Sequence, residues 1–422
     1  MILTAIRQQP QSRQATPATD DNQIRRHRPD YWLIVIVAFL LAIGLIVIYS
    51  ISPALTELRG GHYVQRQMIA IGLSIVAFLV TARIPLRQWQ QWQKPLLILA
   101  ALGTLLALVT PAIPAYPQHR WIRLGSFSLQ SVELLKFALI ISVGGFLATK
   151  VREGVITNYR KTLRPLAIAV GVIGIVVAFI QGDLGSTGVI VAMVTTMGFV
   201  AGLPMRRILF IAAIVAVGTI LAVSSTPYRR ARLNTYLHPE TNCQTDSGHQ
   251  ACQALIAVGS GGMIGLGLGN SVQAYGYLPE AQNDSIFAIY AEKFGFVGSI
   301  VLLALFVTLF ARLQLIIERS PDMFSRLVVS GVLAWLSTQA IINIGAMIGL
   351  LPLKGITLPL ISYGGTSVLF VGAALGLVFQ ISHYTSFTSR FVPHNRQRKP
   401  YEHSIDGRRI GGTHYPDSGR RA

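Results

Sequence analysis

Residues 32–50 read WLIVIVAFLLAIGLIVIYS, a stretch without one charged side chain. A helix needs about 20 apolar residues to cross a hydrocarbon core of about 30 Å. Comparable runs recur along most of the 422-residue chain, which is 52% hydrophobic and only 13% charged. Soluble domains carry about 25% charged residues, so the composition excludes that class of protein. The sequence therefore predicts an all-α integral membrane protein.

Further apolar stretches follow the first one and give about ten predicted transmembrane helices. Their ranges are 32–50, 64–82, 95–112, 132–149, 165–181, 186–203, 208–225, 285–311, 327–348 and 365–385. They form one polytopic membrane domain, residues 32–389. Polar tails at 1–31 and 390–422 flank this domain, and we expect both tails to be disordered because they lack apolar periodicity.

One predicted loop is much longer than the others. Residues 226–284 separate the seventh and eighth predicted helices and contain a series of glycines at 259–269. Long loops in compact proteins are usually functional or disordered. This one favours a part-helical, re-entrant structure, which membrane proteins tolerate only where protein or a water-filled cavity covers the backbone. We therefore expect a cavity beside it.

The distribution of the +19 formal net charge indicates how the chain is oriented. With the N-terminus inside, 26 of the 36 basic residues fall in cytoplasmic segments. The positive-inside rule thus places both termini in the cytoplasm and the loop 226–284 outside. The surplus also attracts anionic membrane lipids. It does not favour a nucleic-acid partner, although nucleic-acid binding by the Arg-rich C-terminal tail is the less favoured alternative.

Several ionisable residues lie within or at the ends of predicted helices, where a charge costs about 2.5–3.5 kcal/mol on insertion scales. Glu133 and Lys136 lie three residues apart on one face of the fourth predicted helix, where they can pair. Asp183 lies in the outer turn between the fifth and sixth, and Glu292 and Lys293 enter the eighth. Such residues are functional candidates, and the alternative is that they form structural ion pairs.

Seven basic residues lie on or near the predicted outer face, against the positive-inside trend. They are Arg66, Arg120, Arg123, Arg229, Arg230, Arg232 and Lys354. Arginine forks match phosphate oxygens, so as a set these cations favour an anionic lipid substrate that carries a pyrophosphate. The alternative for any one of them is snorkelling to lipid headgroups.

Asp284 lies where the long loop re-enters the membrane, immediately before the eighth predicted helix. A carboxylate that is partly withdrawn from water can act as a general base. The alternative is a helix N-cap, because Asp before an apolar run caps well. On the local sequence alone, the cap is the favoured interpretation.

Cys243 and Cys252 are the only cysteines and both lie in the predicted outer loop. Nine positions apart in an extracytoplasmic segment, they could form a disulfide that restrains the loop by roughly 3 kcal/mol. His238 and His249 lie close by, so a zinc site is the alternative, although the spacing matches no usual set of ligands.

Four stretches match longer patterns. They are residues 119–130 (HRWIRLGSFSLQ), 181–187 (QGDLGST), 259–284, which open on GSGG and end on LPEAQND, and 349–365 (GLLPLKGITLPLISYGG). These stretches resemble the RWIxLG…FSxQPSE, QPDLGT, GSGG…GLGNS…LPEAHTDFIF and final PLKG…LPLISYGG motifs of the SEDS family (FtsW, RodA and SpoVE). The resemblance covers nearly all of residues 32–389.

The resemblance implies a peptidoglycan glycosyltransferase that joins lipid II, an undecaprenyl-pyrophosphate-linked disaccharide peptide, into β-1,4 glycan strands. It puts Asp284 at the position of the family's essential acidic residue, which changes the favoured interpretation from cap to catalysis. It also implies partners: a class B penicillin-binding protein that crosslinks the product, and other division proteins. The chain resembles the division branch, FtsW, more than the elongation branch, RodA, which implies the bacterial cytoplasmic membrane at the division septum.

The chain departs from the family pattern close to Asp284. The usual His-Thr reads Gln282-Asn283, the following Phe reads Ser285, and the Pro of QPDLG reads Gly182. The ionisable positions nevertheless match the pattern. This combination fits an active enzyme, and an altered rate or substrate preference is the alternative.

The resulting hypothesis is an inverting transfer with Asp284 as the catalytic base. Candidate substrate-binding residues are Arg66, Arg120, Trp121, Glu133, Lys136, Asp183, Gln250, Glu280, Lys354 and Ser362. We expect no metal site made by the protein, although a divalent cation (Mg²⁺ or Mn²⁺) could be bound through the substrate pyrophosphate. The rival class is a lipid II flippase, which the lack of an inverted repeat and of paired broken helices disfavours.

Overall fold

The computed structural model describes residues 28–59, 62–110, 120–124, 127–208 and 246–384, with the single residues 213, 218, 236 and 243. The predicted tails and the seventh predicted helix lie almost entirely outside the described residues. The elements are α1 (Tyr31–Arg59), α2 (Tyr63–Arg83), α3 (Leu86–Gln91), α4 (Gln93–Val109), β1 (Trp121–Leu124), β2 (Phe127–Gln130), α5 (Ser131–Arg152), η1 (Tyr159–Leu163), α6 (Arg164–Ile175), η2 (Val176–Ile180), α7 (Leu184–Val200), α11 (Asp246–Ser260), α12 (Ile286–Arg319), α13 (Met323–Met347) and α14 (Gly365–Ser382).

The predicted class, a multi-pass helical membrane protein, is confirmed. By length and composition, seven of the described helical segments could cross a membrane: Tyr31–Pro53, Tyr63–Arg83, Ser131–Arg152, Tyr159–Ile180, Ile286–Arg319, Met323–Met347 and Gly365–Ser382. The shorter apolar helices α4 and α7 fall on two more predicted ranges.

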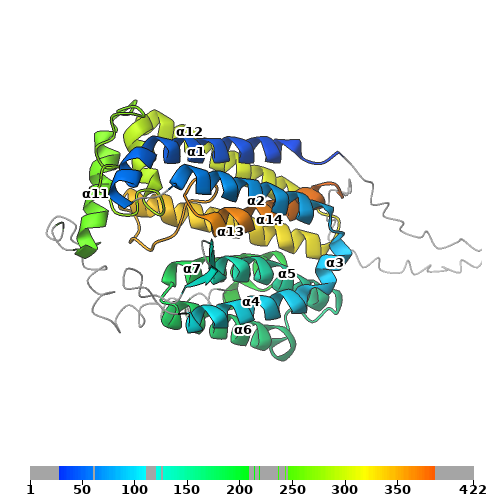
Figure 1. The fold of residues 1–422 in the computed structure, drawn as a ribbon. Coiled ribbons are helices and arrows are strands. Elements are labelled where there is room, and N and C mark those ends of the chain that lie inside the picture. Colours follow the sequence, from blue (N-terminus) through cyan, green and yellow to red (C-terminus); the bar gives the residue numbers. More distant parts are fainter. Residues whose placement is uncertain are drawn as a thin grey trace, which may run out of the picture. The chain divides into compact units, whose positions relative to one another are not determined.

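The centre of the membrane domain is formed by α13, which packs against α5, α7 and α12. Figure 1 shows α13 and α14 between α1, α2 and α12 on one side and α4 to α7 on the other. The apolar stretches of α5, α13 and α14 are mostly buried, whereas those of α1, α2, the segment Tyr159–Ile180 and α12 are only 22–33% buried. This division is expected of helices that face protein and helices that face lipid.

The contact between α2 and α14 depends on two glycines one turn apart. A Cβ at Gly372 would lie 2.1 Å from Ser74 Oγ, and one at Gly376 would lie 2.3 Å from the carbonyl oxygen of Phe78. Small residues four positions apart allow two helix backbones to approach closely. This spacing therefore fixes α14 against α2.

One short β-hairpin interrupts the predicted all-α architecture. β1 and β2 pair antiparallel with Trp121 opposite Gln130. The hairpin docks on the start of α14, because Thr366 Oγ1 donates to the carbonyl of Ser128 at 2.9 Å and accepts from the N–H of Gln130 at 3.3 Å. Such short strands leave little alternating pattern in a sequence.

The long helix α12 is broken near its start, which the sequence did not predict. Gly295 has φ +64° and ψ −163°, and the loop after α11 passes directly across this break. The N–H groups of Leu266 and Gly267 donate to the carbonyls of Glu292 and Lys293 at 2.9 and 3.0 Å. In the other direction, the N–H groups of Phe296 and Val297 donate to the carbonyls of Gly262 and Met263 at 2.9 and 3.0 Å. The loop thus satisfies the backbone groups that the break releases.

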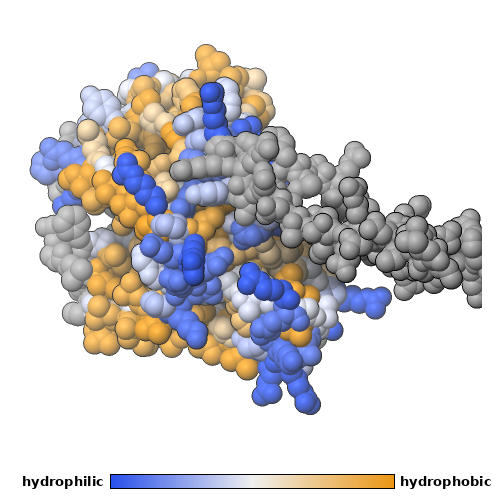
Figure 2. All heavy atoms as spheres, turned by 90° about the vertical axis from the view of Figure 1, so that its right-hand side faces the viewer, coloured by the Kyte–Doolittle hydropathy of each residue, from blue (hydrophilic) through white to orange (hydrophobic). Residues whose placement is uncertain are grey.

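One end of the helix bundle is strongly hydrophilic. Figure 2 looks onto the end where α3 lies and shows hydrophilic side chains there, with hydrophobic ones around them. Arg83, Arg87 and Lys94, in and beside α3, are exposed. These residues belong to a segment predicted to be cytoplasmic.

Candidate functional site

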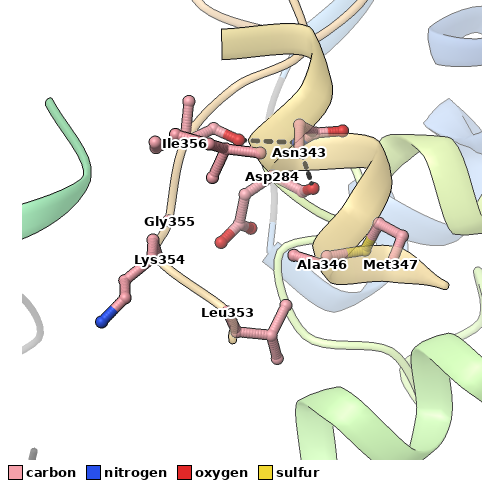
Figure 3. A pocket seen from close by; sticks show the side chains of 9 residues that line it. Asp284, Asn343, Ala346, Met347, Leu353, Lys354, Gly355 and Ile356 are labelled. Carbon is pink, nitrogen blue, oxygen red and sulfur yellow. Dashed lines mark hydrogen bonds between the residues drawn. The ribbon is translucent and has the colours of Figure 1, made fainter. Parts of the chain in front are cut away.

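Asp284 lies at the junction between the loop 261–285 and α12. The N-cap of α12 is Ser285, whose side chain makes no capping hydrogen bond, so Asp284 does not hold the cap position that the local sequence favoured. Asp284 instead lines a small pocket that is partly open to solvent (Figure 3). The other lining residues are Ile342, Asn343, Ala346, Met347, Leu353, Lys354, Gly355 and Ile356.

A single buried amide joins the two walls of this pocket. Asn343 Nδ2 donates to the backbone carbonyl of Asp284 at 2.7 Å and to that of Ile356 at 2.6 Å, as Figure 3 shows. Because Asn343 is only 2% exposed, losing it would leave both carbonyls short of a donor. Sequence reasoning missed Asn343. The signal was an amide one helical turn after Gln339 in an apolar helix.

The Asp284 carboxylate is contacted from α11. Gln250 Nε2 lies 3.3 Å from Asp284 Oδ1 and 3.0 Å from Ser285 Oγ. Gln250 was predicted to bind substrate, and the structure places its amide on the candidate base itself.

The connection between α13 and α14, residues 348–364, forms the wall opposite α13. Gly355 has φ +67°, and a Cβ placed on it would lie 3.7 Å from Asp284 Oδ2. A left-handed backbone of this kind favours glycine. The preceding residue, Lys354, lines the same pocket, and Figure 3 shows its amino group extending away from the Asp284 carboxylate.

Ser362 fixes the Asp284 loop to the same connection. Its hydroxyl donates to the carbonyl of Asn283 at 2.6 Å and accepts from the N–H of Leu358 at 2.7 Å. The N–H of Tyr363 donates to the carbonyl of Gln282 at 2.8 Å. Ser362, a predicted substrate-binding residue, is thus used to position the backbone beside Asp284.

Glu280 shapes the turn that leads to Asp284. It has φ +50°, a left-handed conformation that is uncommon for a residue with a side chain. Its carbonyl accepts from the N–H groups of Asn283 at 2.9 Å and Ser285 at 3.3 Å, and its carboxylate accepts from the Asn283 amide. Strained backbone of this kind is found at functional sites, where the surroundings hold it.

Arg66 lies beside this loop at the start of α2. Its side chain is exposed and hydrogen-bonds the side chain of Tyr363. Burial raises the pKa of the Tyr363 phenol, and the hydrogen bond and positive charge of Arg66 oppose that effect. An accessible guanidinium is therefore held against the 348–364 connection, beside Tyr363.

A second group of predicted residues surrounds the turn before α7. Arg120 donates from Nε to the carbonyl of Gln181 at 3.0 Å and from a terminal nitrogen to that of Gly182 at 2.6 Å. Asp183 is the N-cap of α7, and it accepts from the N–H and the hydroxyl of Ser186, both at 2.9 Å. The Arg120 guanidinium and the Asp183 carboxylate therefore serve mainly to hold the turn.

This turn and the Asp284 pocket are neighbours. A Cβ at Gly185 would lie 2.7 Å from the side chain of Ile356 and 3.2 Å from that of Lys354, so α7 begins directly against the pocket wall. Trp121 is half-buried in the nearby hairpin, and its carbonyl accepts from Thr110 Oγ1 at 3.1 Å. The two groups of predicted residues therefore share one end of the bundle.

Glu133 and Lys136 form the predicted ion pair, with Lys136 Nζ 2.7 Å from Glu133 Oε1. Both side chains are buried, and Nζ also lies 3.2 Å from Gln339 Oε1 and 4.8 Å from the centroid of the Trp335 ring. Gln339 Nε2 donates onward to the carbonyl of Thr357 at 3.0 Å. The pair thus lies among helices and supports the connection that carries Lys354.

Glu292 and Lys293 are likewise enclosed by the loop across the α12 break. The Glu292 carboxylate accepts from the hydroxyl of Ser271 at 2.5 Å and from the next two backbone N–H groups at 2.9 and 3.2 Å. Lys293 Nζ donates to the carbonyl of Leu268 at 2.7 Å. Both charged groups therefore hold the loop, through hydrogen bonds to its backbone and to Ser271 and not through the ion pair that the alternative proposed.

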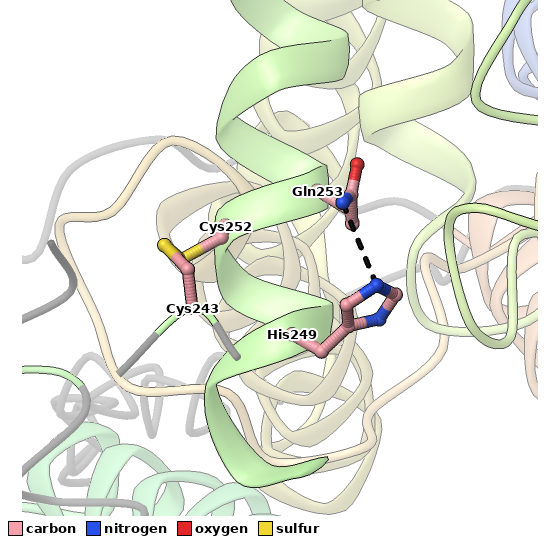
Figure 4. The surroundings of a disulfide bond; sticks show 4 residues. All are labelled: Cys243, His249, Cys252 and Gln253. Carbon is pink, nitrogen blue, oxygen red and sulfur yellow. Dashed lines mark hydrogen bonds between the residues drawn. A yellow bond between two sulfur atoms is a disulfide. The ribbon is translucent and has the colours of Figure 1, made fainter. Parts of the chain in front are cut away.

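Cys243 and Cys252 are joined by the predicted disulfide, shown in Figure 4. His249 lies on α11 with Nε2 3.5 Å from Gln253 Nε2, and His238 lies outside the described residues. Within the described part of the chain, no three His, Cys, Asp or Glu residues are grouped so that they could hold a metal ion. Four of the predicted outer cations also lie outside the described part of the structure: the side chain of Arg123, and Arg229, Arg230 and Arg232.

Comparison with known proteins gives a consistent result. Residues 31–387 match a family model for FtsW, RodA and SpoVE, described as cell cycle proteins. The chain is 34% identical over 368 residues to stage V sporulation protein E of Bacillus subtilis, covering 86% of this chain and 99% of that protein. It is 38% identical over 363 residues to a probable peptidoglycan glycosyltransferase FtsW of Saccharophagus degradans, covering 84% and 92%.

The fold also matches a solved structure. A chain from a peptidoglycan synthase complex that coordinates polymerisation and crosslinking aligns with a TM-score of 0.70 and 26% identity. The alignment covers 84% of this chain and 97% of that one. The chain therefore belongs to the FtsW/RodA/SpoVE family of cell cycle proteins.

Proposed function

We propose that this chain polymerises lipid II and that Asp284 is its general base. The chain is a peptidoglycan glycosyltransferase, as its family and its FtsW relatives indicate. The observation that carries the assignment of the base is the pocket in which Asp284 lies with Lys354. A carboxylate at a partly open pocket can reach an acceptor hydroxyl, and a nearby cation suits an anionic substrate.

The proposed step is a single displacement with inversion. The 4-hydroxyl of the acceptor's GlcNAc gives its proton to Asp284 while its oxygen forms a bond to C1 of the lipid-anchored donor strand. The bond from C1 to the pyrophosphate oxygen breaks, and undecaprenyl pyrophosphate leaves with the electron pair. Such a reaction needs a base on the acceptor side and positive charge on the leaving side.

Arg66 and Lys354 suit the leaving group better than the other predicted cations do. Arg66 is exposed and contacts Tyr363 of the 348–364 connection, and Lys354 of the same connection lines the pocket. Lys136, by contrast, is 1% exposed and paired with Glu133. Any Mg²⁺ or Mn²⁺ would be held through substrate oxygens, and we assign no step to it.

A flippase is less well supported. Transporters use broken helices whose free backbone groups bind substrate or ions. α12 is broken at Gly295, but the loop residues 262–267 already pair with the groups beside the break. The break is thus used to build the outer loop.

The family resemblance supports a place for the chain in septal wall synthesis. A class B penicillin-binding protein that crosslinks the new strand, together with other division proteins, would be its partners. The bacterial cytoplasmic membrane at the division septum would be its location.

The test is polymerisation of labelled lipid II by the purified full chain in detergent micelles with its crosslinking partner. Micelles have no two compartments, so transport cannot contribute to the signal. We expect glycan strands on a gel that a muramidase specific for β-1,4 bonds digests. No polymer from a folded complex would contradict the proposal and favour the flippase.

A further inference from the structure

We infer that Gln250 is a positioning residue for the glycosyl transfer, whose side-chain amide holds the Asp284 carboxylate from α11. The inference rests on the proposed function, in which Asp284 is the base. It gives Gln250 a different role from the direct substrate contact that the sequence suggested.

The hydrogen bonds of Ser285 determine whether the nitrogen or the oxygen of the Gln250 amide faces Asp284. Ser285 Oγ donates its one hydrogen to the carbonyl of Pro279 at 3.0 Å, so it can only accept from Gln250, whose Nε2 lies 3.0 Å away. The same NH₂ group carries a second hydrogen, and Asp284 Oδ1 lies 3.3 Å from this nitrogen. An N–H that donates to a carboxylate favours the ionised form, which is the form a base requires.

The backbone that carries Gln250 is well restrained. α11 packs against α12 and α13, the two helices that also hold the Asp284 loop. Cys252 lies two residues beyond Gln250 and is bonded to Cys243, on the face of α11 shown in Figure 4. The amide is therefore presented from a fixed helix, as a positioning group must be.

The charged surroundings of Asp284 can be stated for the described residues. Lys354 lines the pocket from the 348–364 connection, and Glu280 lies in the same loop as Asp284. His249, next to Gln250 on α11, is titratable, whereas α13 contributes only uncharged residues to the pocket. Changing Gln250 leaves these groups in place, so an altered pH dependence can be assigned to the lost hydrogen bond.

The test is the pH–rate profile of lipid II polymerisation by the full chain with its crosslinking partner. Without the donor, ionised Asp284 is disfavoured, so in Gln250→Leu the acid limb should move to higher pH by about one unit, with kcat about tenfold lower on that limb. Gln250→Glu should move it further, because it adds a second negative charge. KM should stay within about twofold of wild type. Gln253→Leu, the same change one turn along α11, should leave the profile unmoved.

Two results would overturn the inference. One is a Gln250→Leu profile that superimposes on the wild-type profile, and the other is a raised KM with an unmoved acid limb, which is how a substrate contact behaves. If thermal unfolding shows that Gln250→Leu is not folded, the similarly sized Gln250→Glu carries the same test. Failure of the proposed function would look different: either the wild-type chain would make no polymer, or Asp284→Asn would polymerise lipid II at the wild-type rate.

Discussion

At the scale of single residues, glycines decide how the outer loop approaches α12. A Cβ at Gly265 would lie 2.1 Å from the carbonyl oxygen of Lys293, and the residue has φ +82°. Both the contact and the conformation exclude a side chain. The close approach brings the loop within hydrogen-bonding distance of the break in α12, and so determines where the loop begins its path toward Asp284.

The first prediction concerns this position. Gly265→Ala should lower the free energy of unfolding by about 3 kcal/mol, because backbone must shift to admit the methyl group. Gly188→Ala is the matched control: this helical glycine has no atom within 4 Å of an added Cβ, and alanine should stabilise α7 by up to about 1 kcal/mol. Thermal unfolding in detergent measures both. Equal melting temperatures for the two variants would show that the loop is not packed as described.

Among single residues, the candidate base was easier to identify from sequence than the groups that hold it. Asp284 is conspicuous because a carboxylate stands immediately before an apolar run and within a long motif. Asn343 and Ser285 are not conspicuous, because amides and hydroxyls occur in many helices. Only the fold shows that their partners, Asp284 and Gln250, come from distant segments. Ionisable residues are costly to place in a membrane, so they stand out within an apolar stretch of sequence. Neutral polar residues cost less to bury and therefore do not stand out in the same way.

At the scale of elements, the buried Glu133–Lys136 pair connects α5 with α13 through Gln339. Charges enclosed in this way cost several kcal/mol each to desolvate, and their mutual attraction offsets that cost. The spacing of three predicted the pair itself. Its contact with α13 depends on tertiary packing and could not be predicted.

The second prediction separates this pair from an exposed one on the same helix. Lys136→Met should lower the free energy of unfolding by about 3–5 kcal/mol, because Glu133 is left buried without its partner. The double variant, which also carries Glu133→Gln, should regain a large part of the lost stability because the unpaired charge is removed. Lys150→Met removes the exposed pair of Lys150 with Glu153, also at 2.7 Å and three residues apart, and should cost less than about 1 kcal/mol. Similar losses in melting temperature for both lysines would contradict this account.

At the scale of the whole molecule, apolar length predicted most of the membrane domain. Helix-spanning runs are a local property of the chain, so the long helices fall where the sequence placed them. The hairpin at 121–130 and the break at Gly295 are not local properties. They form because other segments, the start of α14 and the glycine-rich loop, supply hydrogen-bond partners.

The third prediction concerns the orientation that the basic residues indicate. The two natural cysteines are bonded to one another, so a single introduced cysteine reports its own side of the membrane. Lys161 and Tyr277 are both exposed, and they belong to segments predicted inside and outside, respectively. In intact spheroplasts, a membrane-impermeant maleimide should label Tyr277→Cys at once and Lys161→Cys only after lysis. The reverse pattern would invert the topology.

The central claim is that Asp284 is the base of lipid II polymerisation. Its most direct test is the initial rate of polymerisation by purified Asp284→Asn with its crosslinking partner, beside Glu153→Gln, the same chemical change at an exposed residue. The account predicts a loss of at least about 100-fold for Asp284→Asn, at an unchanged melting temperature, and a wild-type rate for Glu153→Gln. A folded Asp284→Asn that polymerises at the wild-type rate would contradict it.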